Sequence, residues 1–125
     1  MIKEAVELVK LFHLKAGQPI AEDIKMLEED RVKIRINWIQ EEIEELSQAE
    51  NIYEQVDATI DILYYLLGIV VEMGIPVDEL FQIVHDANMK KLEMGEIKKR
   101  EVDSKIEKPN GWIHPDVEIR KVLTR

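Results

Sequence analysis

Two pairs of carboxylates stand at helical spacing on neighbouring segments of the sequence, Glu42 with Glu45 and Glu54 with Asp57. Residues three or four positions apart lie on one face of a helix, so each pair can present its oxygens together. Carboxylate oxygens are the ligands that Mg²⁺ and Mn²⁺ prefer in proteins. If the two segments face each other, the four acids can bind a divalent cation. The spacing therefore predicts metal-dependent chemistry.

Regularly spaced apolar residues predict the two helices that carry these acids. In each helix they step by three or four positions, which is typical of a face that packs on a core. They are Val32, Ile36, Ile39, Ile43 and Leu46 in the first helix, and Val56, Ile60, Leu63, Leu67 and Val70 in the second. Past Asp61 the second helix is apolar on nearly every side, so we expect it to be central or buried against another subunit.

The acids fall in rows directly beside these apolar faces. Arg35, Trp38, Glu42 and Glu45 form one row, and Glu54, Asp57 and Asp61 begin the other. Two carboxylates about 4 Å apart repel each other by roughly 4 kcal/mol at an effective dielectric constant near 20. Four partly buried acids would therefore need a proton or a cation. The alternative is that the acids form an ordinary solvated helix face.

The short connection between the two acid pairs requires a break in the helix. Only eight residues separate Glu45 from Glu54. On one unbroken helix the pairs would lie about 18 Å apart and could not share an ion. We therefore predict a break between Ser47 and Asn51, where Asn tolerates the left-handed conformation that ends helices.

Two further helices are expected outside this acidic pair. One carries the apolar face from Ile2 to Phe12 and ends at the Gly17 turn, and the other runs from about Val77 to Leu92. The chain beyond Gly95 contains Pro109, Gly111 and Pro115 and is predicted to be an extended C-terminal tail. The predicted fold is all-α, an antiparallel bundle of about four helices.

Composition limits the function further. A chain of 125 residues is long enough for one domain, 1–125, but hardly for two. Its net charge of −9 argues against a nucleic-acid partner. The longest apolar run, from Ile62 to Val71, is too short to cross a membrane. Cysteine is absent, which fits the reducing cytoplasm, and we expect a cytoplasmic location.

The acidic segments resemble those of the MazG-like all-α nucleoside triphosphate pyrophosphohydrolases, particularly the phosphoribosyl-ATP pyrophosphohydrolase-like branch. The resemblance begins with residues 41–46 and continues through Glu54, Asp57, Asp61 and Tyr64. Residues 84–92, with His85 and Asn88-Met89, are similar to the histidine and Asn-Met-x-Lys signature of that branch. Residues 108–112 with Pro115 and Asp116 are similar to its C-terminal lysine–proline–aromatic–proline–aspartate segment. One departure is that the gap between the two acid motifs is shorter than usual.

The resemblance implies a reaction and a set of site residues. The reaction is cleavage of a nucleoside triphosphate between its α- and β-phosphates, with Mg²⁺ as cofactor and Mn²⁺ as the alternative. The implied metal ligands are Glu42, Glu45, Glu54 and Asp57, and Glu41 would orient or deprotonate the attacking water. The resemblance also implies a homodimer or a dimer of dimers, which would complete the bundle.

Five more residues are candidates for substrate binding. The motif match favours phosphate binding by Asn88 and Lys91, although a solvated Lys and a surface Asn are the alternative. Lys108 is selected from a locally basic stretch that could face phosphate or be a mixed surface. Trp38 is either a wall of the base pocket or a core anchor. Asp61 extends the acidic row and could bind a second metal or a sugar hydroxyl, or pair with a lysine.

Three functions remain open from the sequence. The first is a metal-dependent pyrophosphohydrolase that acts on dUTP, dCTP or a modified nucleotide, in a house-cleaning role. The second is a non-catalytic helical dimerisation module, which the complete acid sets argue against. The third is a phosphoribosyl-ATP pyrophosphohydrolase.

Overall fold

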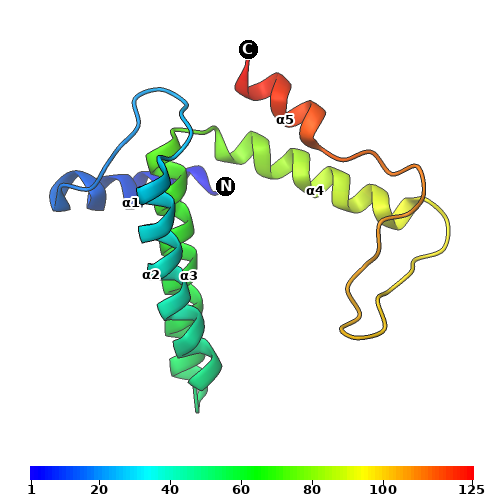
Figure 1. Cartoon of the computed structure of the whole chain (residues 1–125), viewed down its shortest axis with the longest axis horizontal. Helices are drawn as coiled ribbons and strands as arrows, with labels where there is room; N and C mark the ends of the chain where they lie inside the picture. Colours follow the sequence, from blue (N-terminus) through cyan, green and yellow to red (C-terminus); the bar gives the residue numbers. More distant parts are fainter. The chain divides into compact units, whose positions relative to one another are not determined.

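The computed structural model describes residues 1–125, and its regular secondary structure is helical apart from one isolated bridge between Lys99 and Ile106. The chain forms five helices, which are labelled in Figure 1, and the predicted all-α class is confirmed. Their bounds are α1 (Lys3–Ala16), α2 (Glu29–Gln48), α3 (Ile52–Met73), α4 (Val77–Glu93) and α5 (Asp116–Leu123). The sequence predicted about four, and α5 is the helix that it missed.

The chain forms two compact units, Met1–Ile75 and Pro76–Arg125. The first contains α1, α2 and α3, and the second contains α4 and α5. No single helix is both long and apolar enough to cross a membrane, and only α3 and α4 taken together pass that test by length and composition. The expectation of a single domain over 1–125 stays a prediction.

The core of the first unit forms where α1 packs on α3. Val9, Leu67 and Val71 are buried there, and the side chains packed around them are Ile2, Ala5, Val6 and Ile20. The first helix ends as predicted, because Gly17 takes a left-handed conformation with a φ of 74°. Glycine reaches this conformation without the steric cost that a side chain would impose.

The predicted break between the acid pairs is present. Helix α2 ends at Gln48, and Ala49 is extended. Asn51 caps α3: its Oδ1 accepts a hydrogen bond from the Glu54 backbone N–H at 2.9 Å. Asn51 is extended, with a φ of −149°, so it starts the next helix and does not end the previous one in a left-handed conformation. This tight connection lets α2 and α3 lie side by side and antiparallel (Figure 1).

The apolar face of α2 does not pack on α3 as the periodicity suggested. Ile36 is 48% exposed and Ile43 is 50% exposed, and Ile60 on α3 is 54% exposed. Arg35, in the neighbouring row of α2, is buried instead, because it pairs with Glu72 of α3. A buried carboxylate and a buried guanidinium must pair with each other. This pairing, and not the apolar pattern of α2, decides which side chains of α2 face α3.

The second unit contains the helix that the sequence did not predict. Helix α5 packs against α4 inside the segment expected to be extended. Trp112 precedes it and donates a hydrogen bond from its indole N–H to the Ala87 carbonyl at 2.7 Å. A signal for α5 was present, since it has acids in its first turn and bases in its last, which suits the helix dipole.

Candidate functional site

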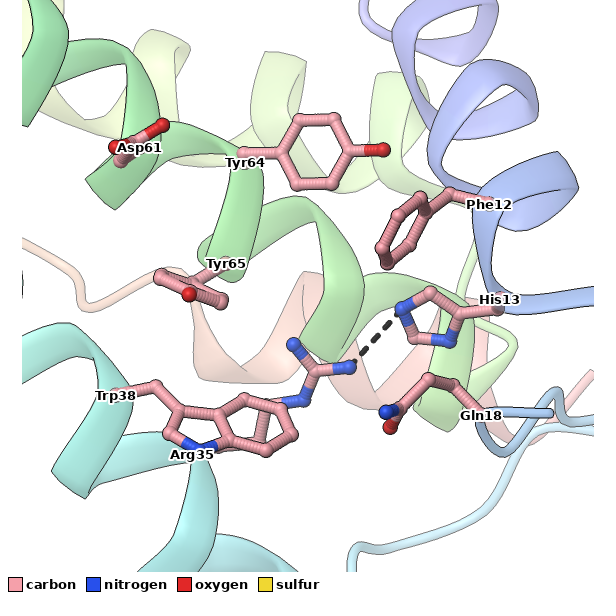
Figure 2. A pocket seen from close by; sticks show the side chains of 8 residues that line it. All are labelled: Phe12, His13, Gln18, Arg35, Trp38, Asp61, Tyr64 and Tyr65. Atoms are coloured by element: carbon pink, nitrogen blue, oxygen red, sulfur yellow. Dashed lines mark hydrogen bonds between the residues drawn. The ribbon is translucent and has the colours of Figure 1, made fainter. Parts of the chain in front are cut away.

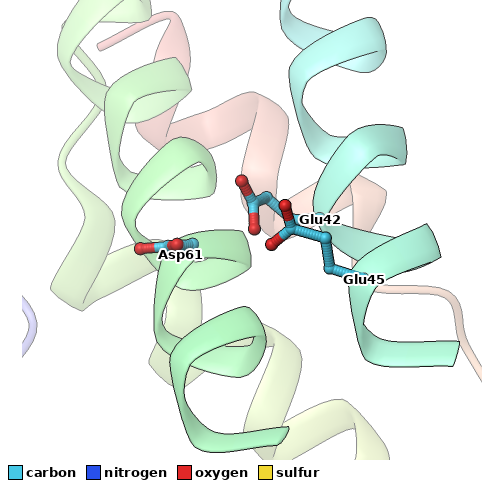
Figure 3. A group of neighbouring side chains, drawn as sticks. All are labelled: Glu42, Glu45 and Asp61. Atoms are coloured by element: carbon cyan, nitrogen blue, oxygen red, sulfur yellow. The ribbon is translucent and has the colours of Figure 1, made fainter. Parts of the chain in front are cut away.

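Three carboxylates converge between α2 and α3. Glu42 and Glu45 come from α2 and Asp61 from α3, and Figure 3 shows the side chains gathered in the space between the two helices. One oxygen from each lies within 4.8 Å of the other two. Glu42 and Asp61 are half-buried, whereas Glu45 is exposed. We call these three residues the acid cluster.

Glu42 has the least favourable electrostatic environment of the three residues in the acid cluster. Its Oε2 is fully buried and has no hydrogen-bond partner. Burial, then the hydrogen bond with Glu45 and the negative charges of Glu45, Asp61 and Asp57, raise the pKa of Glu42 to about 7. Burial and the charges of Asp57 and Glu45 likewise raise the pKa of Asp61. The acid cluster therefore requires a proton or a cation, and its oxygen-only donors suit a hard divalent ion.

This electrostatic arrangement predicts how the stability of the metal-free protein depends on pH. Because the pKa of Glu42 rises on folding from 4.5 to about 7, its protonated form favours the folded state. That contribution is complete below pH 4.5 and is lost as the pH rises through about 7, at a cost on the order of 2 kcal/mol after allowance for solvent screening. Urea unfolding in EDTA at pH 5 and pH 8 measures it. In Glu42→Gln the free energy of unfolding should change less between pH 5 and pH 8 than in the wild type. An equal change in both proteins would show that other groups cause the pH dependence.

The other acids expected at the metal lie close by in different surroundings. Glu54 and Asp57 line a cavity of about 270 Å³ together with Glu45 and Gln48. Glu54 also takes part in capping the N-terminus of α3, because its Oε2 accepts a hydrogen bond from the Glu50 backbone N–H at 3.0 Å. Glu41 is exposed, and its carboxylate accepts from Asn37 Nδ2 at 3.4 Å. The structure thus joins Asp61, not Glu54, to Glu42 and Glu45, and the four-acid ligand set stays a prediction.

A cavity of about 310 Å³ adjoins the acid cluster through Asp61. Figure 2 shows Asp61 at one end and His13 with Gln18 at the other. Two aromatic pairs line it: Trp38 with Tyr65, whose ring centres are 5.7 Å apart, and Phe12 with Tyr64, at 5.8 Å. We call this cavity the aromatic pocket; its lining residues are Phe12, His13, Gln18, Arg35, Trp38, Asp61, Tyr64 and Tyr65. Trp38 therefore lies in the wall of a cavity and not in the closed core. Its contact with a base stays a prediction.

Tyr65 lies between the aromatic pocket and the acids, and the sequence did not identify it as a site residue. Burial, followed by the negative charges of Glu42, Asp61 and Glu41, raises the pKa of its hydroxyl, against a smaller opposing effect of Arg35. The phenol therefore remains protonated and can donate a hydrogen bond near the acids. No pattern in the sequence distinguished it from a core tyrosine.

A buried ion network holds Arg35, which lines the aromatic pocket. Glu72 accepts from Arg31 Nε at 2.8 Å and from Arg31 Nη2 at 3.0 Å, and Arg35 Nε donates to the same carboxylate. Burial opposes the charge of Glu72, but the hydrogen bonds from the two guanidinium groups outweigh it and lower its pKa. Glu72 is the only acid between Asp61 and Met73 of α3, and a lone acid in an apolar helix is a signal that it has a buried partner.

The guanidinium of Arg35 is held at Nε by Glu72, at Nη2 by His13 and on its face by Trp38. His13 Nδ1 donates to the Pro19 carbonyl at 2.8 Å, so its Nε2 accepts from Arg35 Nη2 at 3.0 Å. The guanidinium also stacks 4.9 Å from the centre of the Trp38 ring. Gly68 makes this approach possible, because a Cβ at that position would lie 2.8 Å from Arg35 Cζ. The network fixes both the orientation of Arg35 and the ring that it contacts.

The remaining predicted substrate residues lie in the second unit. Lys91 and Lys108 both place their ammonium groups over the Trp112 ring, at 4.6 and 5.8 Å from its centre. Both line a cavity of about 380 Å³. Asn88 is exposed on α4 and does not line this cavity. The structure therefore brings Lys91 and Lys108 together, and their role in binding phosphate stays a prediction.

The chain matches one known protein family. The family model described as phosphoribosyl-ATP pyrophosphohydrolase matches residues 4–88, which is about two thirds of the chain. The matched region contains the acid cluster and the aromatic pocket and ends before Lys91. None of the curated proteins matches the chain. The match supports a pyrophosphohydrolase-like function, and the chain belongs to the phosphoribosyl-ATP pyrophosphohydrolase family.

Proposed function

We propose that the protein is a metal-dependent nucleotide pyrophosphohydrolase that cleaves (d)NTP to (d)NMP and pyrophosphate. The observation that carries this proposal is the buried Oε2 of Glu42, which has no hydrogen-bond partner and faces two further carboxylates. Burying an unpaired acid is costly, and a cation at this position would remove the cost. The same cation would be needed to bring a triphosphate to a chain with a net charge of −9.

The donor set defines which cation the site would hold. Glu42, Glu45 and Asp61 offer only oxygen ligands, which fits Mg²⁺ first and Mn²⁺ second, with Asp57 and Glu54 as the further predicted ligands. A bound Mg²⁺ would offset the negative charge of the phosphates during cleavage. Glu41 is next to Glu42 in the chain and exposed, and we propose that it orients the attacking water.

The aromatic pocket would bind the nucleoside. Its aromatic walls can contact the faces of a base, and its shared residue Asp61 connects it with the acid cluster. Asn88, Lys91 and Lys108 are the proposed phosphate ligands, and Asn88 precedes Lys91 by one turn of α4. Since nucleoside triphosphates of this kind are metabolites of the cytoplasm, we also propose a cytoplasmic location.

Two alternative functions are weighed against this one. A helical dimerisation module would not need the unpaired buried oxygen of Glu42, because a scaffold gains nothing from that cost. Hydrolysis of phosphoribosyl-ATP would use the same chemistry at the same acid cluster. The substrate therefore separates this alternative from a house-cleaning enzyme that acts on dUTP, dCTP or a modified nucleotide.

A pyrophosphate-release screen tests the proposal. We expect turnover of at least one standard or modified (d)NTP with Mg²⁺ or Mn²⁺, and none in EDTA, because the acids alone would repel the triphosphate. Phosphoribosyl-ATP is included as a substrate, and preference for it would select that alternative. A complete lack of turnover with every substrate and metal would contradict the proposed function.

We propose in addition that the protein forms a homodimer or a dimer of dimers. Parts of the apolar faces of α2 and α3 lie uncovered in the single chain, since Ile36, Ile43 and Ile60 are each about half exposed. Exposed apolar faces of this kind on a folded chain mark an interface with another molecule. A second copy has the same faces and can cover them.

Sedimentation equilibrium measures this expectation. We expect a dimer or tetramer for the wild type, and dissociation towards the monomer when Ile36→Asp places a charge in the apolar face. Val102→Asp serves as the control, because Val102 is exposed in the other unit. A monomeric wild type would refute the oligomer.

A further inference from the structure

One end of the aromatic pocket presents hydrogen-bond donors. No group at this end is restricted to accepting a hydrogen bond. Arg35 is 3% exposed and uses Nε and Nη2 for its bonds to Glu72 and His13. The N–H groups of Nη1 have no acceptor in the protein. Nη1 lies against Gly68 of α3, and Figure 2 shows the Arg35 guanidinium among the side chains that line the pocket.

Gln18 and His13 complete this end of the pocket. The Gln18 Oε1 accepts from Arg31 Nη2 at 3.4 Å, which leaves the Nε2 amide as the unengaged donor. Both ring nitrogens of His13 are engaged, one with the Pro19 carbonyl and one with Arg35. His13 therefore offers no acceptor to a ligand. The hydroxyl of Tyr64 can turn to donate or accept and does not discriminate between ligands.

The opposite end of the pocket fixes the direction in which a nucleotide would enter. Asp61 belongs both to the pocket and to the acid cluster, where the phosphates would be held if the proposed function is correct. The sugar then lies towards Asp61, and the far edge of the base reaches Gln18 and Arg35 (Figure 2). The far edge of a pyrimidine carries its 4-substituent, and that of a purine carries its 6-substituent.

We propose that the aromatic pocket selects bases with an exocyclic carbonyl at this edge, the 4-keto pyrimidines and 6-keto purines. At position 4 or 6 a carbonyl oxygen accepts from Arg35 and Gln18, whereas the amino group of cytosine or adenine would meet these donors with N–H groups. The adjacent ring nitrogen reverses in the same comparison, from an N–H donor in the keto base to an acceptor in the amino base, and the Tyr64 hydroxyl can pair with either. Buried donors that lose their acceptors make such a mismatch costly. This inference rests on the proposed function for the orientation of the base, and it disfavours adenine nucleotides as substrates.

Matched substrate pairs test the selection without a change in base size. Deoxyuridine and deoxycytidine triphosphates form one pair, and deoxyinosine and deoxyadenosine triphosphates form the other. We expect kcat/KM to be at least ~10-fold higher for the keto member of each pair. Equal values, or a preference for the amino member in both pairs, would overturn the proposal.

A single isosteric variant tests whether the donors cause the preference. Gln18→Glu replaces the amide donor with a carboxylate that accepts, so the keto preference should fall by ~10-fold or reverse. Gln40→Glu makes the same chemical change at an exposed position of α2 that does not line the pocket, and it should keep the wild-type ratio. A Gln18→Glu ratio equal to that of the wild type would overturn the assignment.

Nucleoside binding separates this inference from the proposed reaction. Deoxyuridine and deoxycytidine are titrated into the metal-free full chain while the NMR shift of the Trp38 indole N–H is followed. Tighter binding of deoxyuridine supports the selection even if no triphosphate is hydrolysed, in which case the proposed function alone fails. Turnover without any keto preference, in hydrolysis or in nucleoside binding, refutes the selection and leaves the proposed function standing.

Discussion

Glu42→Gln should lower kcat/KM by at least ~10²-fold, while the variant remains folded. The amide keeps the shape of the side chain but loses the charge that would bind a divalent cation. It also removes a buried negative charge, whose burial and neighbouring carboxylates raise the pKa of Glu42 to about 7, so the metal-free variant should be at least as stable as the wild type near neutral pH. Pyrophosphate release and urea unfolding, measured on the same preparation, give the two results.

Glu44→Gln is the matched control for this variant. Glu44 lies in the same turn of α2, but it is exposed and accepts a hydrogen bond from Gln48 at 2.6 Å outside the acid cluster. Its removal changes the net charge by the same amount and should leave kcat/KM within about twofold, because an exposed charge is largely screened. Full activity in Glu42→Gln would remove Glu42 from the site, whatever the result for Glu44.

Glu72→Gln should reduce the free energy of unfolding by about 3–5 kcal/mol. Its side chain is 1% exposed and neutralises Arg35, which is 3% exposed, together with the partly exposed Arg31. Without the carboxylate, the two guanidinium groups face each other with no counter-charge between α2 and α3. A loss of this size is a large part of the stability of a small protein and should be visible in urea unfolding.

Glu79→Gln controls for the loss of an ion pair as such. Glu79 pairs with Arg125 through two hydrogen bonds of 2.7 Å, but both side chains are exposed. Exposed pairs contribute at most about 1 kcal/mol. Equal losses for the two variants would show that burial adds nothing to the Glu72 network.

Much of the helical fold follows from the sequence. The turn at Gly17 and the break before Asn51 were both predicted, because glycine and short polar residues favour the backbone conformations found there. Helix α5 was missed because proline and glycine around it suggested an extended chain. Its charges follow the helix dipole, but this signal is weak compared with apolar periodicity.

The sequence predicted the types of residue in the candidate site more completely than it predicted their arrangement in space. Spacing alone brought Glu42 and Glu45 to one face, and the structure places Asp61 with them. The sequence could not show that Glu54 also binds the backbone at the start of α3, since that depends on the conformation of Glu50 and Asn51. Nor could it show that Arg35 would be buried in place of the apolar face, because that requires Glu72 opposite it and Gly68 to make room.

The order of charges along α2 and α3 selects the register of this helical hairpin. Attraction between Arg35 and Glu72 closes one end, whereas like charges of Glu42 and Asp61 meet at the other. Sliding one helix past the other by a turn would separate the attracting pair and leave an arginine buried without its acid. Charged side chains therefore set the register of α2 against α3, which apolar side chains set in most helical hairpins. Ile36, Ile43 and Ile60 do not take part in this alignment and remain available for contacts outside the hairpin.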